Sequence, residues 1–289
     1  MADILEIKGL RANRGGREVL HGVSLQVQAG QIVAPLGANG AGKSSLVMAA
    51  AGVLDEVTGE VALGGKRLDR LPALARRRAG LAVVAEGHHV LPGLTVRDNI
   101  AAAALTLPRG EAAARVDEAL ALFPELKERL GVEAQMLSGG QKQMVNIAQA
   151  LVIRTRVLLV DELSLGLAPA IVLRLGEMLK RIAAEGVGVL LIEQFTTLAL
   201  SLASVAHVMV RGNLIFSGTA QVLKDRPEIL HGAFSVRKSS GLRRVPLAPC
   251  HQDPDPLSSR WRASNRTDDG PTGAALRRSS GTCRLSPPK

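Results

Sequence analysis

Short runs of apolar residues alternate with longer amphipathic segments along the first 234 residues. The uncharged runs lie at 32–34, 81–84, 157–160 and 187–192. Runs of this length are typical of strands that are buried on both faces of a sheet with parallel strands. The segments 112–123 and 170–184 have helical periodicity and lie between such runs. The pattern therefore predicts an α/β fold built around a mixed sheet.

Three further segments predict antiparallel strands. Residues 4–8 and 19–27 favour two strands, and 208–216 favours a hairpin with Gly212 and Asn213 as its turn. We assign all three segments to an antiparallel β subdomain beside the main sheet.

Strand signals stop between about residues 88 and 136. The segment Thr95-Val96-Arg97-Asp98 resembles the N-terminal cap of a helix, and helical periodicity follows it. We expect a helical subdomain inserted here into the α/β core.

The pattern ends after residue 234. Residues 235–289 hold seven of the fourteen prolines, with many Ser and Arg and little periodicity. This composition predicts a disordered tail after a domain that covers residues 1–234. The tail is either a non-functional extension or a segment that docks on a partner or a lipid surface.

The tail also explains the charge of the chain. It holds eleven basic and four acidic residues, and so carries +7 of the formal net charge of +10. A basic patch on the folded part is therefore not expected, and neither is a nucleic-acid partner.

Both cysteines, Cys250 and Cys283, lie in the tail, so residues 1–234 have no disulfide framework.

Aromatic residues are rare in the chain. Aromatic residues make up 2% of it and Tyr is absent, so the core must be built from Ala, Leu, Val and Ile. No signal-peptide core follows the N-terminus. The most apolar region, 186–210, is interrupted by Glu193, Gln194 and His207, so we expect no membrane span.

A glycine-rich loop after the first apolar run indicates phosphate binding. Residues 37–44, GANGAGKS, fit the pattern GxxxxGK[ST] between a predicted strand and a predicted helix. Glycines let the backbone N–H groups turn toward phosphates, and the helix N-terminus attracts anions. Lys43 should reach the β- and γ-phosphates of ATP, and the Ser44 hydroxyl should bind Mg²⁺. The residues expected to bind nucleotide here are Gly37, Asn39, Gly40, Gly42, Lys43, Ser44 and Ser45. A chance Gly-rich loop would not explain the strand and the helix on its two sides.

Two carboxylates end the apolar run 157–160. Asp161 and Glu162 would lie beside the phosphate loop, at the carboxyl end of a buried strand. Asp161 would then hold Mg²⁺, and Glu162 would orient or deprotonate the attacking water. Many apolar strands end in an acidic residue, so this signal depends on the phosphate loop upstream.

A second glycine-rich segment precedes a predicted helix at 142–153. Residues 137–141 read LSGGQ and would form a second anion site at a helix N-terminus. One ATP needs only one such site from one chain, so the natural use is to cap ATP held by another subunit. The alternative is an ordinary turn.

LSGGQ between the phosphate loop and the Asp-Glu strand end resembles the ABC ATPase family over about residues 3–234. Within that family the closest resemblance is to ATPase subunits of branched-chain amino-acid importers. It rests on the stretches 19–25, Glu86-Gly87, 164–169 and 191–194.

The resemblance implies roles for individual residues. Ser138, Gly139 and Gly140 would contact the γ-phosphate of ATP held by the opposite subunit. Glu86 takes the place of the family's glutamine, which senses Mg²⁺ and water and borders the permease surface. The alternative for Glu86 is a solvated loop carboxylate without such a role. Gln194 takes the catalytic switch position, or else only caps a strand.

Besides Glu86 and Gln194, four residues depart from the family pattern. Arg14 stands where an aromatic residue usually stacks on adenine, and either stacks there itself or is solvated. Pro35 removes a ladder N–H from a predicted central strand. Gln149 replaces an Arg of the signature helix, and Leu163 replaces a Pro.

The resemblance implies an ATPase that energises an ABC importer for branched-chain or other amino acids. Its cofactors would be ATP and Mg²⁺. Its partners would be a second ABC ATPase subunit in a homo- or heterodimer, transmembrane permease subunits and, indirectly, an extracytoplasmic solute-binding protein. It would lie in the cytoplasm, on the inner face of the plasma membrane. The alternatives are a catalytically impaired regulatory subunit, or an ABC ATPase for another solute such as urea or an amide.

Other nucleotide-binding classes fit less well. ABC ATPases of DNA repair or translation carry a long coiled coil or two ATPase domains, for which residues 1–234 leave no room. A small-molecule kinase would not explain LSGGQ, or the separation of 118 positions from Lys43 to Asp161.

Overall fold

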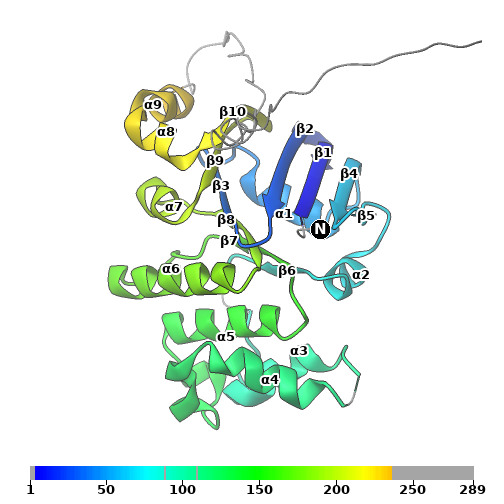
Figure 1. The fold of residues 1–289 in the computed structure, drawn as a ribbon, viewed down its shortest axis with the longest axis vertical. Coiled ribbons are helices and arrows are strands. Elements are labelled where there is room, and N and C mark those ends of the chain that lie inside the picture. Colours follow the sequence, from blue (N-terminus) through cyan, green and yellow to red (C-terminus); the bar gives the residue numbers. More distant parts are fainter. Residues whose placement is uncertain (1–3, 88, 109, 236–289) are drawn as a thin grey trace, which may run out of the picture. The chain divides into compact units, whose positions relative to one another are not determined.

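Two β-sheets face each other across one helix, α1 (Lys43–Ala51), in the computed structural model of the protein (Figure 1). The structure describes residues 4–87, 89–108 and 110–235. The smaller sheet is antiparallel, with strand order β2-β1-β4-β5. Its strands are β1 (Ile4–Arg14), β2 (Arg17–Gln28), β4 (Val57–Leu63) and β5 (Lys66–Arg67). The predicted strands at 4–8 and 19–27 are confirmed, and both are longer than expected.

The larger sheet is mixed, with strand order β10-β9-β3-β8-β7-β6. Its strands are β3 (Ile32–Leu36), β6 (Leu81–Val84), β7 (Val157–Asp161), β8 (Gly188–Ile192), β9 (Val205–Val210) and β10 (Asn213–Thr219). All neighbours are parallel except β9 and β10. The four apolar runs are thus strands of one sheet, and the predicted α/β fold with a mixed sheet is confirmed.

The central strands are apolar throughout because side chains on both of their faces are buried. Leu158 and Val160 of β7 belong to the core on the side of the α5 and α6 helices. Val157 and Leu159 of the same strand belong to the core shared with α1 and the antiparallel sheet. Strand periodicity sends successive side chains to opposite faces, so a strand between two cores needs an apolar residue at every position.

The predicted hairpin at 208–216 was assigned to the wrong sheet. The β9–β10 hairpin joins the mixed sheet, because β9 pairs with β3 from Val33 to Leu36. The turn is also shifted by one residue: Arg211 and Gly212 both have positive φ, and Asn213 already pairs with Val210. Positive φ at both central residues matches the twist of an antiparallel pair.

Between β6 and β7 the described residues form helices and turns, with a single isolated bridge between Thr95 and Glu133. The helices here are α3 (Val96–Ala104), α4 (Ala112–Ala121), the short 3-10 helices η1 (Pro124–Arg129) and η2 (Ala134–Met136), and α5 (Gly139–Leu151). Thr95 caps α3 by accepting the Asp98 N–H, as predicted. The proposed boundaries of the insert at 88–136 and of the ATPase domain at 1–234 stay predictions.

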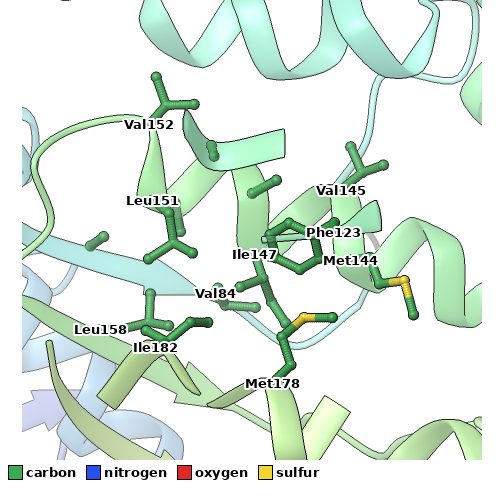
Figure 2. Packing of buried hydrophobic residues seen from close by; sticks show 14 of the residues in the cluster. Val84, Phe123, Met144, Val145, Ile147, Leu151, Val152, Leu158, Met178 and Ile182 are labelled. Atoms are coloured by element: carbon green, nitrogen blue, oxygen red, sulfur yellow. The ribbon is translucent and has the colours of Figure 1, made fainter. Parts of the chain in front are cut away.

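The remaining helices pack around the mixed sheet. They are α2 (Ala73–Arg78), α6 (Pro169–Ala184), α7 (Thr196–Leu202), α8 (Ala220–Asp225) and α9 (Pro227–Ser235). Figure 2 shows Leu158 and Val84 of the sheet in one apolar cluster with Ile147 of α5 and Met178 of α6. In the described ranges, no helix is both long and apolar enough to cross a membrane. The predicted tail lies outside the described residues, apart from Ser235 at the end of α9.

Pro35 lies inside β3 without disrupting the sheet. The ladder between β3 and β8 is formed at Ile32 and Val33 and stops before Pro35. Beyond that point β3 continues beside β9 only, where Pro35 is opposite His207. The missing N–H therefore falls where the strand is no longer paired on both sides.

Candidate functional site

The phosphate loop connects β3 to α1 and is shaped by its glycines. Gly40 and Gly42 have φ of 80° and 103°, a region that residues with a side chain rarely adopt. A Cβ on Gly42 would also lie 2.9 Å from the Val19 carbonyl oxygen, and one on Gly37 would clash with the Met209 backbone. The loop therefore needs Gly for its conformation and for its close approach to β2 and β9.

Lys43 is held over this loop. Its Nζ donates to the carbonyl oxygens of Gly37, at 2.8 Å, and of Ala38, at 3.2 Å, and the residue is 7% exposed. Burial lowers the pKa of Lys43, while the nearby carboxylates of Glu162 and Asp161 raise it. An ammonium group at the mouth of a loop of backbone N–H groups is a suitable partner for phosphate oxygens.

One hydrogen bond joins the phosphate loop helix to the acidic strand end. Ser44 Oγ donates to Asp161 Oδ1 at 3.1 Å, across 117 positions of the sequence. Asp161 ends β7 and is 2% exposed. Burial raises the pKa of Asp161, whereas the bond from Ser44 lowers it. The predicted proximity of the strand end to the phosphate loop is thus observed.

The donor set at this place suits Mg²⁺. No group of three or more His, Cys, Asp or Glu side chains in the described part of the chain could hold a metal alone. Mg²⁺, however, commonly takes one or two protein oxygens and completes its shell with water and substrate phosphates. The Ser44 and Asp161 oxygens beside a phosphate loop match that requirement.

Glu162 follows β7 with an uncommon backbone conformation. Its φ is 53°, and its N–H donates to the Ile192 carbonyl oxygen at 2.9 Å. Burial raises the pKa of this half-buried carboxyl group, as do the carboxylates of Glu86 and Asp161, while Lys43 lowers it. Left-handed backbone at a residue with a side chain often marks a functional position.

Glu86 and Gln194 are exposed and follow neighbouring parallel strands. Glu86 lies two residues after β6, and its charge raises the pKa of Asp161 and Glu162. Gln194 lies two residues after β8. The carboxyl ends of parallel strands meet at one edge of a sheet, so both residues lie at the edge that carries Asp161 and Glu162.

Arg14 is exposed at the tip of the β1–β2 hairpin, where it pairs with Arg17. Two residues further along β2, the Val19 carbonyl borders Gly42 of the phosphate loop. The structure therefore places Arg14 on the hairpin that approaches the phosphate loop. Its proposed contact with adenine stays a prediction.

The LSGGQ segment, which we call the signature loop, begins α5. Ser138 is the N-cap: it accepts the Gln141 N–H at 3.3 Å, and Gln141 Oε1 accepts the Ser138 N–H at 3.1 Å. Gly139 and Gly140 lie in the first turn of α5. The predicted helix start at 142 was wrong, because this capping box begins the helix at Gly139. A Cβ on Gly140 would clash with Ile171 of α6.

The site residues fall into two groups within one chain. The phosphate loop caps α1 between the sheets, beside Asp161 and Glu162. The signature loop begins α5, which packs against α3 and α4 in the helical region at the bottom of Figure 1. The expectation that the signature loop serves ATP held by another subunit stays a prediction.

The sequence reasoning missed a buried pair beside the site. Glu193 and Ser164 are 2% and 3% exposed, and the Ser164 hydroxyl donates to Glu193 Oε1. Glu193 directly follows the apolar strand β8, and a carboxylate at a strand end is the signal that singled out Asp161 and Glu162. Its partner could not be read from the sequence, because the two residues meet only through the parallel pairing of β7 with β8.

A largely apolar cavity of about 650 Å³ lies at the C-terminal end of α1. It is bordered by the end of α1 and by residues of α2, β6, α3 and α5. Val53 and Leu74 on its wall are 59% and 50% exposed, and Arg77 and Gln149 supply polar groups. Arg77 donates to the Gln149 carbonyl oxygen at 3.3 Å.

Known proteins resemble this chain in sequence and in fold. The profile of the ABC transporter family matches residues 20–164. The high-affinity branched-chain amino acid transport ATP-binding protein BraG of Pseudomonas aeruginosa is 39% identical over 74% of this chain and 92% of its own. The lipopolysaccharide export system ATP-binding protein LptB of Escherichia coli K12 is 31% identical over 76% and 93%.

A solved structure agrees with these relatives. The structure of cbiO1 from Clostridium perfringens, part of the ABC transporter complex cbiONQ, superposes with a TM-score of 0.70 at 26% identity. The match covers 80% of this chain and 94% of that one. With its phosphate loop, acidic strand end and signature loop, the chain belongs to the ABC transporter family as an ATP-binding subunit, and such subunits are ATPases.

Proposed function

We propose that this chain hydrolyses ATP to energise an importer of branched-chain or other amino acids. The observation that carries the ATPase part is the hydrogen bond between Ser44 and Asp161, which joins the phosphate loop to the strand end that bears Glu162. The import of amino acids is supported by the likeness to BraG and is proposed on that ground.

The phosphate loop would bind the triphosphate of ATP. Its backbone N–H groups and the N-terminus of α1 would face the phosphate oxygens, together with Asn39 and Ser45. The Lys43 ammonium, which now donates to two loop carbonyls, would turn to the β- and γ-phosphates. Ser44 and Asp161, with Glu86 at the rim, would hold Mg²⁺, which when bound would neutralise the charge of the phosphates.

Glu162 would act on the attacking water. Burial raises the pKa of this carboxyl group above its ordinary value, so Glu162 is a stronger base than an exposed glutamate. Its N–H is fixed on Ile192, which holds the carboxylate at the edge of the site. Gln194, on the loop after β8, would donate a hydrogen bond from its amide to the γ-phosphate.

A complete site would need a second ATPase subunit. Ser138, Gly139 and Gly140 of one chain would approach the γ-phosphate held by the phosphate loop of the other. ATP bound between the two surfaces favours the closed pair, because only that state makes both sets of contacts. Loss of the γ-phosphate would remove this bridge and reopen the pair.

The cavity beside α1 would take a helical segment of a permease subunit. Val53 and Leu74 expose apolar surface on its wall, while Arg77 and Gln149 supply groups for polar contacts. Glu86 is close in sequence to Ala85 and His89 of the same wall. Through the permease the chain would lie on the cytoplasmic face of the plasma membrane and would serve an extracytoplasmic solute-binding protein indirectly.

A transporter for another solute is the second candidate. The likeness to LptB favours it, because a chain 31% identical to this one serves lipopolysaccharide export. The ATPase chemistry would be the same in both cases. The two candidates differ in the permease that the cavity accepts and in the solute that stimulates turnover.

The test is MgATP turnover by the full-length chain, measured beside the affinity for a fluorescent ATP analogue. We expect Glu162→Gln to bind the analogue within about 3-fold of wild type and to lose turnover by roughly 100-fold or more. Asp98→Asn, a change at an exposed position in the first turn of α3, should leave both quantities unchanged. Undiminished turnover in Glu162→Gln would overturn the assignment of this base.

A wild-type chain that binds ATP without turnover would instead favour an impaired regulatory subunit. Addition of a permease and its solute-binding protein would then separate impairment from a need for partners. Turnover stimulated by leucine, isoleucine or valine would support the import of branched-chain amino acids.

A further inference from the structure

Glu193 ties together the two loops that carry Glu162 and Gln194. Its Oε1 accepts from the Ser164 hydroxyl and, at 3.1 Å, from the Gln194 N–H. One residue before it, the Ile192 carbonyl oxygen accepts the Glu162 N–H at 2.9 Å. Two hydrogen bonds therefore join the segments that follow β7 and β8, and a third fixes the Gln194 backbone on the Glu193 carboxylate.

Stability alone does not account for a carboxylate at this place. Glu193 follows five buried apolar or glycine positions of β8, and it is itself 2% exposed. Its second oxygen, Oε2, is buried and has no hydrogen-bond partner within the described residues. A buried carboxylate with one unsatisfied oxygen costs free energy relative to an apolar residue of similar size.

The tie restricts the parts of the site that are otherwise exposed. Gln194 is exposed, and so are Leu165 and Phe195, at 46% and 58%. Leu165 follows Ser164, which donates to Glu193, and Gln194 donates to Glu193 through its own N–H. Phe195 is the next residue after Gln194. Without Glu193 the two loops would keep only the bond between Glu162 and Ile192.

We propose that Glu193 is a positioning residue for ATP hydrolysis, which holds Gln194 and the loop of Ser164 in register with Glu162. The proposal rests on the proposed ATPase function. Glu193 does not touch the nucleotide in this scheme; it fixes the backbone from which Gln194 reaches the γ-phosphate.

The test compares Glu193→Ala, Glu193→Gln, Ser164→Ala and the double variant in the full-length chain. We expect kcat to fall roughly 10- to 100-fold in Glu193→Ala and about 3- to 10-fold in Ser164→Ala, because small displacements of reacting groups are costly. Affinity for the fluorescent ATP analogue should stay within about 2-fold of wild type. The double variant should be no slower than Glu193→Ala, since both changes remove the same tie.

Glu193→Gln separates positioning from charge. A Gln amide oxygen can accept the same two hydrogen bonds, so we expect kcat within about 3-fold of wild type. Ser201→Ala, a serine on α7 that bonds only to its own helix, is the matched control and should leave kcat unchanged. Hydrogen exchange at the Gln194 amide should become faster in Glu193→Ala while the amides of α5 keep their protection.

The outcomes are distinct. If the wild type hydrolyses ATP and kcat is unchanged in Glu193→Ala and Ser164→Ala, the positioning role is overturned. A parallel loss of ATP affinity and of α5 protection in Glu193→Ala, not rescued by Gln, also overturns it, because the residue would then only maintain the fold. Absence of turnover in the wild type, both alone and with a permease and its solute-binding protein, overturns the proposed ATPase function itself.

Discussion

The phosphate loop illustrates how single residues determine the site. Gly40 and Gly42 both have positive φ, yet their surroundings differ. A Cβ on Gly42 would meet the Val19 carbonyl oxygen at 2.9 Å, whereas one on Gly40 would meet nothing within 4 Å. Gly42 is therefore required both for its backbone angle and for space, and Gly40 for its backbone angle alone.

This difference predicts unequal effects of Ala at the two positions. Gly40→Ala should lower the free energy of unfolding by about 1 kcal/mol, which is the cost of a left-handed residue with a side chain. Gly42→Ala adds a clash with backbone, and should cost at least about 2 kcal/mol. Urea unfolding of the two variants and the wild type measures both values. Equal losses would show that the contact with Val19 relaxes freely.

His207 makes the stability of the protein depend on pH. It is 6% exposed on β9, its Nδ1 hydrogen-bonds with Ser217, and burial lowers its pKa from 6.5 to about 4. At a pH between those two values His207 is mostly protonated in the unfolded chain and mostly neutral in the folded chain. Stability from His207 is therefore present above pH 6.5 and is lost as the pH falls toward 4.

We expect His207 to contribute a loss of about 2 kcal/mol in unfolding free energy between pH 7.5 and pH 5.0. The measurement is urea unfolding at both pH values for wild type and His207→Asn, in which this part of the loss should vanish. His231→Asn, an exposed position on α9, is the control and should retain it. An equal pH dependence in wild type and His207→Asn would contradict the assignment.

At the scale of elements, the helix of the phosphate loop is stabilised at its far end by a buried arginine. Arg76 of α2 is 4% exposed and donates to the carbonyl oxygens of Ala49 and Ala50, in the last turn of α1. It also donates to the Leu71 and Asp69 carbonyls. A cation at a helix C-terminus interacts favourably with the helix dipole and satisfies carbonyls that lack helical partners.

Replacement of this arginine should destabilise the protein. Arg76→Met keeps most of the side-chain volume but removes four hydrogen bonds to carbonyl oxygens, two of them buried, so we expect a loss of about 3 kcal/mol in unfolding free energy. Arg78→Met, at an exposed position of the same helix, should change it by less than about 0.5 kcal/mol. Thermal or urea unfolding gives the comparison, and similar losses in both variants would rule out the capping role.

The sequence predicted the elements better than their partners. Continuous apolar runs located β3, β6, β7 and β8, because these strands lie between two cores and cannot alternate with polar residues. Local turn residues located the β9–β10 hairpin, but nothing local specifies that β9 pairs with β3. The same limit applies at the site: motifs located Lys43 and Asp161, whereas the tie between Glu193 and Ser164 depends on long-range pairing.

At the scale of the whole molecule, the described residues form three apolar clusters. One lies between the mixed sheet and the helices α3 to α6, and another between the two sheets around α1. The third joins β3 and β9 to α7, α8 and α9. Among the described residues, all three draw their members from positions 5–233.

A chain that ends at residue 235 should therefore keep the fold and the site. We expect its melting temperature to stay within about 2 °C of the full chain, with ATP affinity and turnover unchanged. A chain that ends at residue 219 loses α8 and α9, and should melt several degrees lower, roughly 5 °C or more. Lower turnover in the 235-residue chain would indicate a function for the basic tail.

The helix α1 has one end at the phosphate loop and the other at the cavity, because Gly42 begins it and Ala51 lines the cavity wall. Nine helical residues span only about 14 Å, and both sheets hold the helix along its length. A displacement of α1 by nucleotide must then alter the cavity. Linkage makes the relation reciprocal: if ATP strengthens the binding of a segment in the cavity by some factor, that segment strengthens the binding of ATP by the same factor.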